Sequence, residues 1–347
     1  MQKQTEKDQA SAPAQAEKKQ LIDLFHRSIS YLRLSLTDQC NLRCLYCTPR
    51  TLTEKLDSHE LLTYEELLRV VRLAVAMGIR KIRLTGGEPL VRREVTTFIR
   101  GLAAIPDLAD IRLTTNGVLL DDHAEALYAA GIRKLNISLD TLRPERYREI
   151  TGADLFDRVW AGIERVTAMG FVPIKLNIVA MNGINDDEFL DFARLSITSP
   201  YQIRFIEFMP MGAGTTWEKE KYIATAAIKE RLETLGRLEP VTTGRMEGPA
   251  RVYRYTAAAG SIGFISPISH HFCDRCNRLR LTSEGKLRSC LLTDRETDLK
   301  AIIRSGGDDE AIRQALTATI LDKPRGHGLT ADGSGGNCHG RMSRIGG

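Results

Sequence analysis

Six short apolar-rich runs, each followed by a helical stretch, recur roughly every 25–35 residues, and this repeat constrains the fold more than any other feature. Alternating strands and helices at such spacing are typical of right-handed parallel β/α units. The sequence therefore predicts an α/β fold in the form of an open or partial barrel. The predicted strands are 31–36, 79–85, 111–115, 134–139, 172–180 and 202–208, and the predicted helices are 64–77, 125–130, 155–169 and 186–195.

One face of every predicted strand is polar, whereas an ordinary β/α barrel fills its interior with branched apolar side chains. Parallel strands covered by helices rarely leave a face in bulk water, so we expect a polar lumen rather than a solvated sheet face. Lys and Arg dominate this face and predict an anionic ligand such as a phosphate. The polar positions are Arg33, Ser35, Lys81, Arg83, Thr85, Arg112, Thr114, Asn136, Ser138, Lys175, Asn177, Gln202 and Arg204.

Cys40, Cys44 and Cys47 form a C-x3-C-x2-C group directly after the first predicted strand. Active sites of β/α folds lie in the loops at the carboxyl ends of their strands. Three thiolates leave the fourth position of a zinc site or of a cluster open to another ligand. The group predicts an iron–sulfur cluster with one open iron, and a zinc site with a distant fourth ligand is the alternative.

A second group, Cys273, Cys276 and Cys290, has the spacing C-x2-C-x13-C and again lacks an obvious fourth ligand. His270 and His271 lie close by in the sequence and could complete a structural zinc site. Against zinc, Arg278 and Arg280 follow at strand spacing, so both side chains point to one side. Two cations beside a metal site indicate that an anionic ligand lies there too.

The composition of the 347 residues suits one large domain with an appendage, or two domains. No apolar run approaches the roughly 18 residues that span a bilayer, and the formal charge of +5 is too small to imply nucleic-acid binding. Seven cysteines without an export signal point to the reducing cytoplasm.

After residue 208 the repeat of strands and helices weakens. There we expect helices at 224–235 and 301–321, strands at 279–282 and 286–289, and a glycine-rich tail over 322–347.

The cysteine groups accompany Gly86-Gly87-Glu88-Pro89 after the second strand, Asn277-Arg278-Leu279-Arg280, and a terminal Ile345-Gly346-Gly347. With these motifs, residues 28–347 resemble the GTP 3',8-cyclase family (molybdenum cofactor biosynthesis protein A) of the radical S-adenosylmethionine superfamily. The resemblance implies an incomplete (β/α)6 barrel of the radical S-adenosylmethionine type over residues 28–245. A C-terminal iron–sulfur-binding α+β extension follows over 246–347, and a disordered arm precedes the barrel over 1–27.

The same resemblance implies a lyase with two [4Fe–4S] clusters and S-adenosylmethionine. It would cyclise GTP to (8S)-3',8-cyclo-7,8-dihydroguanosine 5'-triphosphate through a 5'-deoxyadenosyl radical that abstracts the ribose 3' hydrogen, the first step of molybdenum cofactor biosynthesis. Cys40, Cys44 and Cys47 would bind the radical-generating cluster. Cys273, Cys276 and Cys290 would bind the second cluster, whose open iron would meet the guanine base.

The resemblance also assigns the remaining contacts. S-adenosylmethionine would contact Tyr46, Gly87, Ser138 and Met209. GTP would contact Arg33, Lys81, Arg83, Thr114, Lys175, Arg204, Arg278, Leu279 and Arg280. The Gly346-Gly347 tail would enter the active site. Cys338 has no counterpart in the resemblance, and we expect it to be a free cysteine rather than a cluster ligand.

Further implications concern partners. The enzyme would be cytoplasmic, use a flavodoxin- or ferredoxin-type electron donor, pass its product to a cyclic pyranopterin monophosphate synthase, and admit a homodimer, without nucleic acid or membrane. One alternative is a radical S-adenosylmethionine enzyme acting on a peptide or RNA, although the converging basic positions disfavour a peptide. The other is a non-catalytic zinc or electron-transfer protein, which would not explain the Gly-Gly-Glu-Pro segment or the polar lumen.

Overall fold

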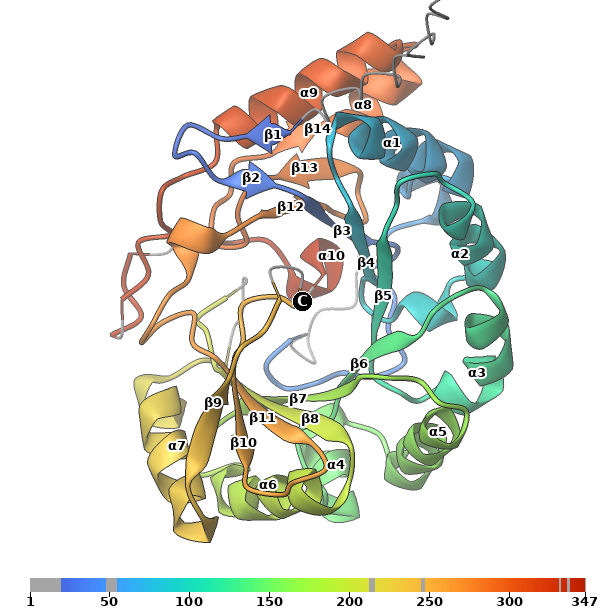
Figure 1. Cartoon of the computed structure of the whole chain (residues 1–347). Coiled ribbons are helices and arrows are strands. Elements are labelled where there is room, and N and C mark those ends of the chain that lie inside the picture. The colour runs from blue at the N-terminus through green and yellow to red at the C-terminus, as the bar shows by residue number, and fades with distance from the viewer. Residues whose placement is uncertain are drawn as a thin grey trace, which may run out of the picture.

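The computed structural model describes residues 20–47, 55–211, 216–244, 247–330, 332–335 and 338–346. Its centre is a curved sheet with eight adjacent parallel strands, which Figure 1 shows from one end. In spatial order they are β12 (Arg278–Leu281), β3 (Tyr31–Ser35), β4 (Lys81–Thr85), β5 (Asp110–Thr115), β6 (Lys134–Ser138), β7 (Ile174–Ala180), β8 (Tyr201–Glu207) and β11 (Ser261–Ile265). The six strands predicted from the repeat are confirmed, with ends displaced by at most two residues.

Antiparallel strands extend both edges of this sheet. β13 (Lys286–Arg288) and β14 (Thr297–Asp298) continue it beyond β12, and β10 (Arg251–Tyr255) and β9 (Leu238–Val241) continue it beyond β11. Among the described residues β14 and β9 do not pair, so the barrel is open and the predicted incomplete barrel is confirmed. β9, β10 and β11 were not predicted, because the first two are short and interrupt their apolar residues with charged side chains or a proline.

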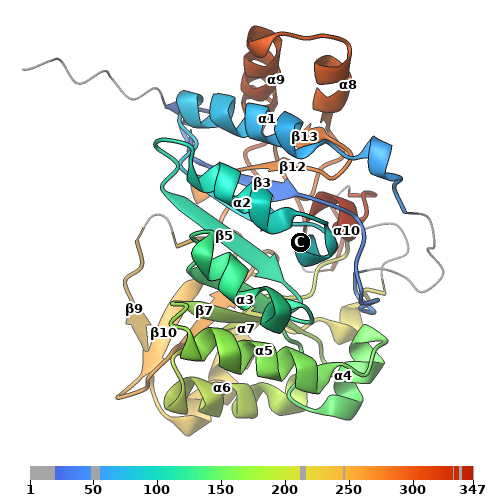
Figure 2. The same cartoon turned by 90° about the vertical axis from the view of Figure 1, so that its right-hand side faces the viewer.

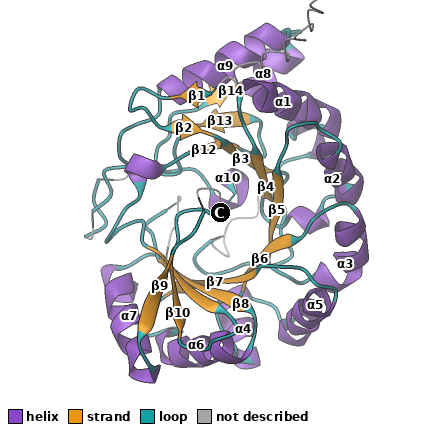
Figure 3. Ribbon diagram, in the orientation of Figure 1, coloured by secondary structure: helices purple, strands orange, loops and turns teal. Residues whose placement is uncertain are grey.

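The helices form an outer ring around the sheet, as Figure 3 shows, and Figure 2 shows several of them stacked along one side. They are α1 (Tyr64–Met77), α2 (Val95–Ala103), α3 (Leu120–Ala129), α4 (Pro144–Thr151), α5 (Phe156–Ala168), α6 (Phe189–Thr198) and α7 (Thr225–Leu232). Sequence chemistry sets the bounds of α1: the side chains of Thr63 and Glu66 cap its first turn reciprocally, and Gly78 ends it with a φ of 125°.

The C-terminal region corrects one prediction. The single helix expected at 301–321 is two helices, α8 (Leu299–Arg304) and α9 (Asp309–Leu321). Gly306 takes a φ of 87°, and a Cβ on Gly307 would lie 2.5 Å from the Ile302 carbonyl oxygen. Only glycine suits this chain reversal. The shorter 3-10 turns are Ser58–Glu60, Pro89–Val91, Asp186–Glu188, Lys219–Lys221, Glu233–Leu235 and Cys273–Arg275.

Residues 20–27, which the sequence places in the N-terminal arm, form a small hairpin in which β1 (Leu21–Ile22) pairs with β2 (Ser28–Ile29). Arg27 forms an ion pair with Asp23 and donates to the carbonyl oxygen of Cys273 at 2.8 Å. Ordered structure therefore begins earlier than expected and is tied to the second cysteine group. Residues 1–19 lie outside the described residues, and the division into domains stays a prediction.

The two faces of the central sheet differ in chemistry as expected. Outward-facing residues such as Leu32, Leu34 and Ile82 are buried in the hydrophobic core beneath the helices, whereas the polar positions face inward. The short helix α10 (Met342–Ile345) lies inside the barrel in Figure 1. None of the helices that the structure describes is both long and apolar enough to cross a membrane.

Candidate active site

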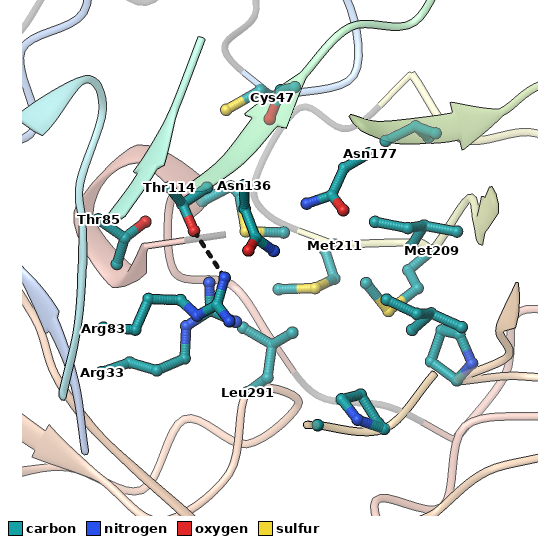
Figure 4. Close-up of a pocket in the computed structure, with 18 of the residues that line it drawn as sticks. Arg33, Cys47, Arg83, Thr85, Thr114, Asn136, Asn177, Met209, Met211 and Leu291 are labelled. Atoms are coloured by element: carbon teal, nitrogen blue, oxygen red, sulfur yellow. Dashed lines mark hydrogen bonds between the residues drawn. The ribbon is translucent and has the colours of Figure 1, made fainter. Parts of the chain in front are cut away.

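A cavity of about 320 Å³ follows the polar inner face of the sheet, a volume suited to a small-molecule ligand. All six cysteines of the two groups line it, and all six are half-buried free thiols. Figure 4 shows Cys47 at the top of this space, Arg33 and Arg83 pointing into it from the left, and Asn177 and Met209 on the right. The fold therefore brings together two cysteine groups that are more than 200 residues apart in the sequence.

The Gly-Gly-Glu-Pro segment is fitted against the first cysteine loop. The Gly87 backbone N–H donates to the Thr37 carbonyl oxygen at 2.7 Å, and that of Glu88 donates to the Gln39 carbonyl oxygen at 2.8 Å. A Cβ on Gly87 would lie 2.3 Å from the same Gln39 oxygen, so no other residue fits without a shift of the loop. Gly87 also lines the cavity. The glycine pair thus positions the segment that carries the cysteines.

Acidic and amide side chains surround the first cysteine group. The Tyr46 hydroxyl donates to Asp140 at 2.7 Å, and burial raises the pKa of Asp140 to about 6. Asn116 donates to the Cys40 sulfur at 3.6 Å. Burial raises the pKa of the Cys40 thiol to about 11 and that of Cys44 well above its usual range. These thiols consequently need a strong positive charge beside them to become thiolates.

Basic side chains surround the second group instead. Cys273 begins a 3-10 turn, and Cys276 follows it. Burial alone would raise the pKa of the Cys276 thiol, but Arg278 and Lys323 outweigh burial and lower that pKa to about 6. His270 and His271 are exposed and do not line the cavity. Among the described residues, no three His, Cys, Asp or Glu side chains form a group that could hold a single metal ion.

Most of the expected GTP contacts line the cavity between the two cysteine groups. Arg83 donates to the Tyr31 hydroxyl at 2.5 Å and to Thr114 at 3.1 Å, the bond dashed in Figure 4. Arg204 is 3% exposed, and its Nη2 atom has no hydrogen-bond partner among the described residues. A buried guanidinium with an unused donor is suited to an anionic ligand. The basic residues in this wall are Arg33, Arg83, Arg204, Arg278 and Arg280.

Three expected GTP contacts do not reach the cavity wall with their side chains. Leu279 packs in the hydrophobic core, because it alternates with Arg278 and Arg280 along β12. Lys81 lies 3.9 Å from an Asp110 oxygen, and Lys175 lies 2.6 Å from Glu247. Both lysines are on the inward face but behind the cavity wall.

Several cavity residues were missed by the sequence analysis. Asp140 and Asn116 follow the carboxyl ends of β6 and β5. A polar residue at that position could have been predicted to line the site, because active sites of β/α folds lie there. Tyr31 reaches the cavity from the start of β3. Glu247 lies between β9 and β10, in a stretch for which the sequence predicted no element.

The C-terminal tail approaches the cavity from inside the barrel. Arg280 donates to the Gly346 carbonyl oxygen at 2.7 Å. A Cβ on Gly346 would lie 2.4 Å from the Thr85 methyl carbon, so this approach requires a glycine. Gly347 lies outside the described residues. Cys338 is buried beside Arg288, 3.6 Å from its Nη2 atom, and does not line the cavity.

The donor set of the cavity fits two iron–sulfur clusters. Each group offers three thiols, and thiolates are the ligands that such clusters take. Both groups border one shared space, where each would hold a cluster beside the ligand. Tyr46, Gly87, Ser138 and Met209 line it as well.

Comparisons with known proteins match this arrangement. Residues 34–196 match the model of the Radical SAM superfamily, and residues 201–329 match that of Molybdenum Cofactor Synthesis C. The GTP 3',8-cyclase of Thermodesulfovibrio yellowstonii is 50% identical over 306 residues, which cover 88% of this chain and 94% of the relative. That of Heliobacterium modesticaldum is 45% identical over 328 residues, covering 94% of this chain and 100% of the relative.

Among solved structures, Streptococcus suis SuiB bound to S-adenosylmethionine superposes with a TM-score of 0.62. The identity is 14%, and the match covers 86% of this chain and 67% of SuiB. At this identity the similarity concerns the fold alone.

Proposed function

The chain belongs to the GTP 3',8-cyclase family of radical S-adenosylmethionine enzymes, and we propose that its cavity converts GTP to (8S)-3',8-cyclo-7,8-dihydroguanosine 5'-triphosphate. This reaction is the first step of molybdenum cofactor biosynthesis, and the cofactors are two [4Fe–4S] clusters and S-adenosylmethionine. When bound, the first cluster and S-adenosylmethionine supply the 5'-deoxyadenosyl radical that removes the ribose 3' hydrogen. The observation that carries the proposal is that two cysteine triads and five arginines line one cavity.

The residues of the two triads would bind different clusters, and further cavity residues would bind S-adenosylmethionine. Cys40, Cys44 and Cys47 would hold the radical-generating cluster, and Cys273, Cys276 and Cys290 the second cluster. Tyr46, Gly87, Ser138 and Met209 border the same cavity, which supports their assignment to S-adenosylmethionine. The short distance between the Tyr46 hydroxyl and Asp140 orients the aromatic ring beside the first triad.

The arginines of the wall would bind the triphosphate. Arg83, Arg204 and Arg280 are buried, which strengthens their charge interactions because the surroundings screen charge less than water does. With the phosphates held by arginines and the guanine held at the second cluster, both ends of the substrate are positioned. The ribose between them then has one orientation, which a radical reaction needs if it is to remove one hydrogen selectively. Thr114 accepts a hydrogen bond from Arg83, and the tail residue Gly346 lies beside Thr85 at the edge of the cavity.

Four properties stay proposals: location in the cytoplasm, a flavodoxin- or ferredoxin-type electron donor, a homodimer, and transfer of the product to a cyclic pyranopterin monophosphate synthase. The free thiols favour a reducing compartment.

One experiment tests the proposed function. The protein is reconstituted anaerobically, its iron and sulfide are counted, and S-adenosylmethionine, a reductant and GTP are added. We expect about eight irons per chain, the content of two cubane clusters, and 5'-deoxyadenosine that forms only when GTP is present. Stoichiometric zinc without iron would overturn the proposal, and so would cofactor cleavage that ignores GTP and responds to a peptide or RNA.

A further inference from the structure

The carboxylate of Glu247 bridges two buried cations at the edge of the cavity. Its oxygens lie 2.6 Å from the Lys175 amine and 3.2 Å from an Arg112 guanidinium nitrogen. The two cations belong to β7 and β5 and are 2% and 0% exposed, whereas the Glu247 side chain is 34% exposed. Glu247 also lines the cavity, and the two cations do not. It therefore stands between the deepest basic residues and the ligand space.

The carboxylates of the cavity wall differ in what they bind. Asp140 accepts from Tyr46 and from a backbone N–H. Glu207 accepts from Thr225, Ile268 and Ser269. Of the cavity-lining carboxylates in the described part of the chain, Glu247 alone forms ion pairs with basic side chains. Burial alone would raise its pKa, but Lys175 and Arg112 lower that pKa to about 2, so Glu247 is an anion at any physiological pH.

The backbone that carries Glu247 is separate from the backbone that carries the cations. Glu247 follows β9 and is next to Gly248, which takes a φ of 96°. A Cβ on Gly244 or on Gly248 would meet no atom within 4 Å, so the backbone on either side borders open space. The carboxylate can therefore leave Lys175 and Arg112 without a change in the central sheet.

We propose that Glu247 occupies the place of a substrate phosphate in the GTP-free protein, and that the terminal phosphates of GTP displace it from Lys175 and Arg112. The inference rests on the proposed function for the identity of the substrate. Arg112 also pairs with the buried Asp110 at 2.7 Å, whereas Glu247 is the one carboxylate among the described residues that pairs with Lys175. A buried Lys175 cation without an anion would destabilise the fold, and Glu247 supplies that anion until the substrate arrives. An oligophosphate long enough to reach Lys175 compensates for the lost ion pairs, whereas a shorter one does not. Glu247 would thereby select for triphosphates.

The test measures binding to the anaerobically reconstituted holoenzyme, with inorganic tripolyphosphate, GTP and guanosine as separate probes. In Glu247→Gln we expect the affinity for tripolyphosphate and for GTP to rise by roughly tenfold, the effect of removing one moderate charge interaction. The affinity for guanosine should stay unchanged. Glu239→Gln is the matched control, since it makes the same charge change at an exposed position of β9 outside the cavity wall. Unchanged or weaker tripolyphosphate binding in Glu247→Gln, or an equal gain in the control, would overturn the inference.

A double-mutant cycle tests the partner. Lys175→Met removes the cation that Glu247 neutralises, so the gain from Glu247→Gln should shrink in that background. If Glu247→Gln does not fold, Glu247→Asp keeps the charge with a shorter reach and should show a smaller gain. An undiminished gain in the Lys175→Met background, or weaker binding in Glu247→Asp, would count against displacement.

The outcomes also separate this inference from the proposed function. If Glu247→Gln binds tripolyphosphate more tightly but no GTP-dependent 5'-deoxyadenosine forms, the displacement of Glu247 by phosphate is supported and the proposed GTP reaction is refuted. If GTP-dependent 5'-deoxyadenosine forms but Glu247→Gln binds tripolyphosphate no more tightly than the wild type, the proposed GTP reaction stands and the displacement of Glu247 is refuted.

Discussion

The two cysteine triads offer the same number of thiols to the same cavity but differ in the charged side chains beside them. Around the first, Glu88 and Asp140 add to burial and help keep the pKa values of Cys40 and Cys44 high. Around the second, Arg278 and Lys323 lower the pKa of Cys276 to about 6, although burial raises the pKa of Cys273. The net charge around an iron–sulfur cluster helps set its reduction potential. Negative surroundings suit a centre that gives up an electron, and positive surroundings suit one that holds an anionic substrate.

The largest expected effect separates the two triads by function. Cys44→Ser should abolish 5'-deoxyadenosine formation, because the first triad generates the radical. Cys276→Ser should lose about half of the iron yet keep the spectroscopic signal of the first cluster and some cofactor cleavage. Iron analysis, electron paramagnetic resonance and product chromatography measure this. Cys338→Ser is the control and should keep all the iron. Loss of both clusters in either variant would show that the triads do not act independently.

A second effect, roughly one hundredfold, concerns thiol reactivity in the metal-free protein at pH 7. With a pKa of about 6, Cys276 is mainly thiolate at that pH, whereas Cys40, with a pKa of about 11, is almost entirely thiol. Both are half-buried, so access alone does not separate them. Alkylation by iodoacetamide, followed site by site with mass spectrometry, should level off above about pH 6 for Cys276 and keep rising toward pH 11 for Cys40. Parallel pH profiles would refute the asymmetry.

The cluster-binding role of the two cysteine groups and the positions of the central strands could be predicted from the sequence, because both depend on local patterns. Alternation along a strand assigns each side chain to a face, and Arg33, Arg83 and Arg204 indeed line the cavity. Alternation does not indicate depth. Lys81 begins β4 and Lys175 is the second residue of β7, so both face inward yet lie behind the wall.

The acidic residues of the site could not be predicted from the sequence for a different reason. Glu247 meets Lys175 and Arg112 only because β11 pairs with β8 at the edge of the sheet and carries β10 with it. The pairing of β11 with β8 is long-range, and no local pattern encodes it. Asp140 follows a predicted strand, but many strands are followed by polar residues. The Gly306-Gly307 pair could have predicted the break between α8 and α9. It was overlooked because the apolar residues of 301–321 keep a helical periodicity across the pair.

A third prediction sharpens the comparison at the second triad. Arg278→Gln removes the cation that contributes most to lowering the pKa of Cys276, so that pKa should rise by about one unit and alkylation at pH 6 should slow several-fold. The reduction potential of the second cluster should fall in the holoenzyme. Arg275→Gln is the control, since Arg275 is exposed and lies even closer to Cys276 in the sequence. An unchanged rate in Arg278→Gln would assign the low pKa to another cause.

The smallest effect concerns the acidic end of the cavity. Asp140→Asn removes a negative charge that raises the pKa of Cys44, so alkylation of Cys44 in the metal-free protein should rise by about threefold at pH 8. Because the pKa of Asp140 is about 6, the carboxyl group is neutral at pH 5, and the variant and the wild type should converge there. The Tyr46 hydroxyl would also lose its carboxylate acceptor, so the KM for S-adenosylmethionine should rise while the affinity for GTP stays the same. A difference at Cys44 that persists at pH 5 would mean that Asp140 acts through packing, and the two ends of the cavity would then differ by shape rather than by charge.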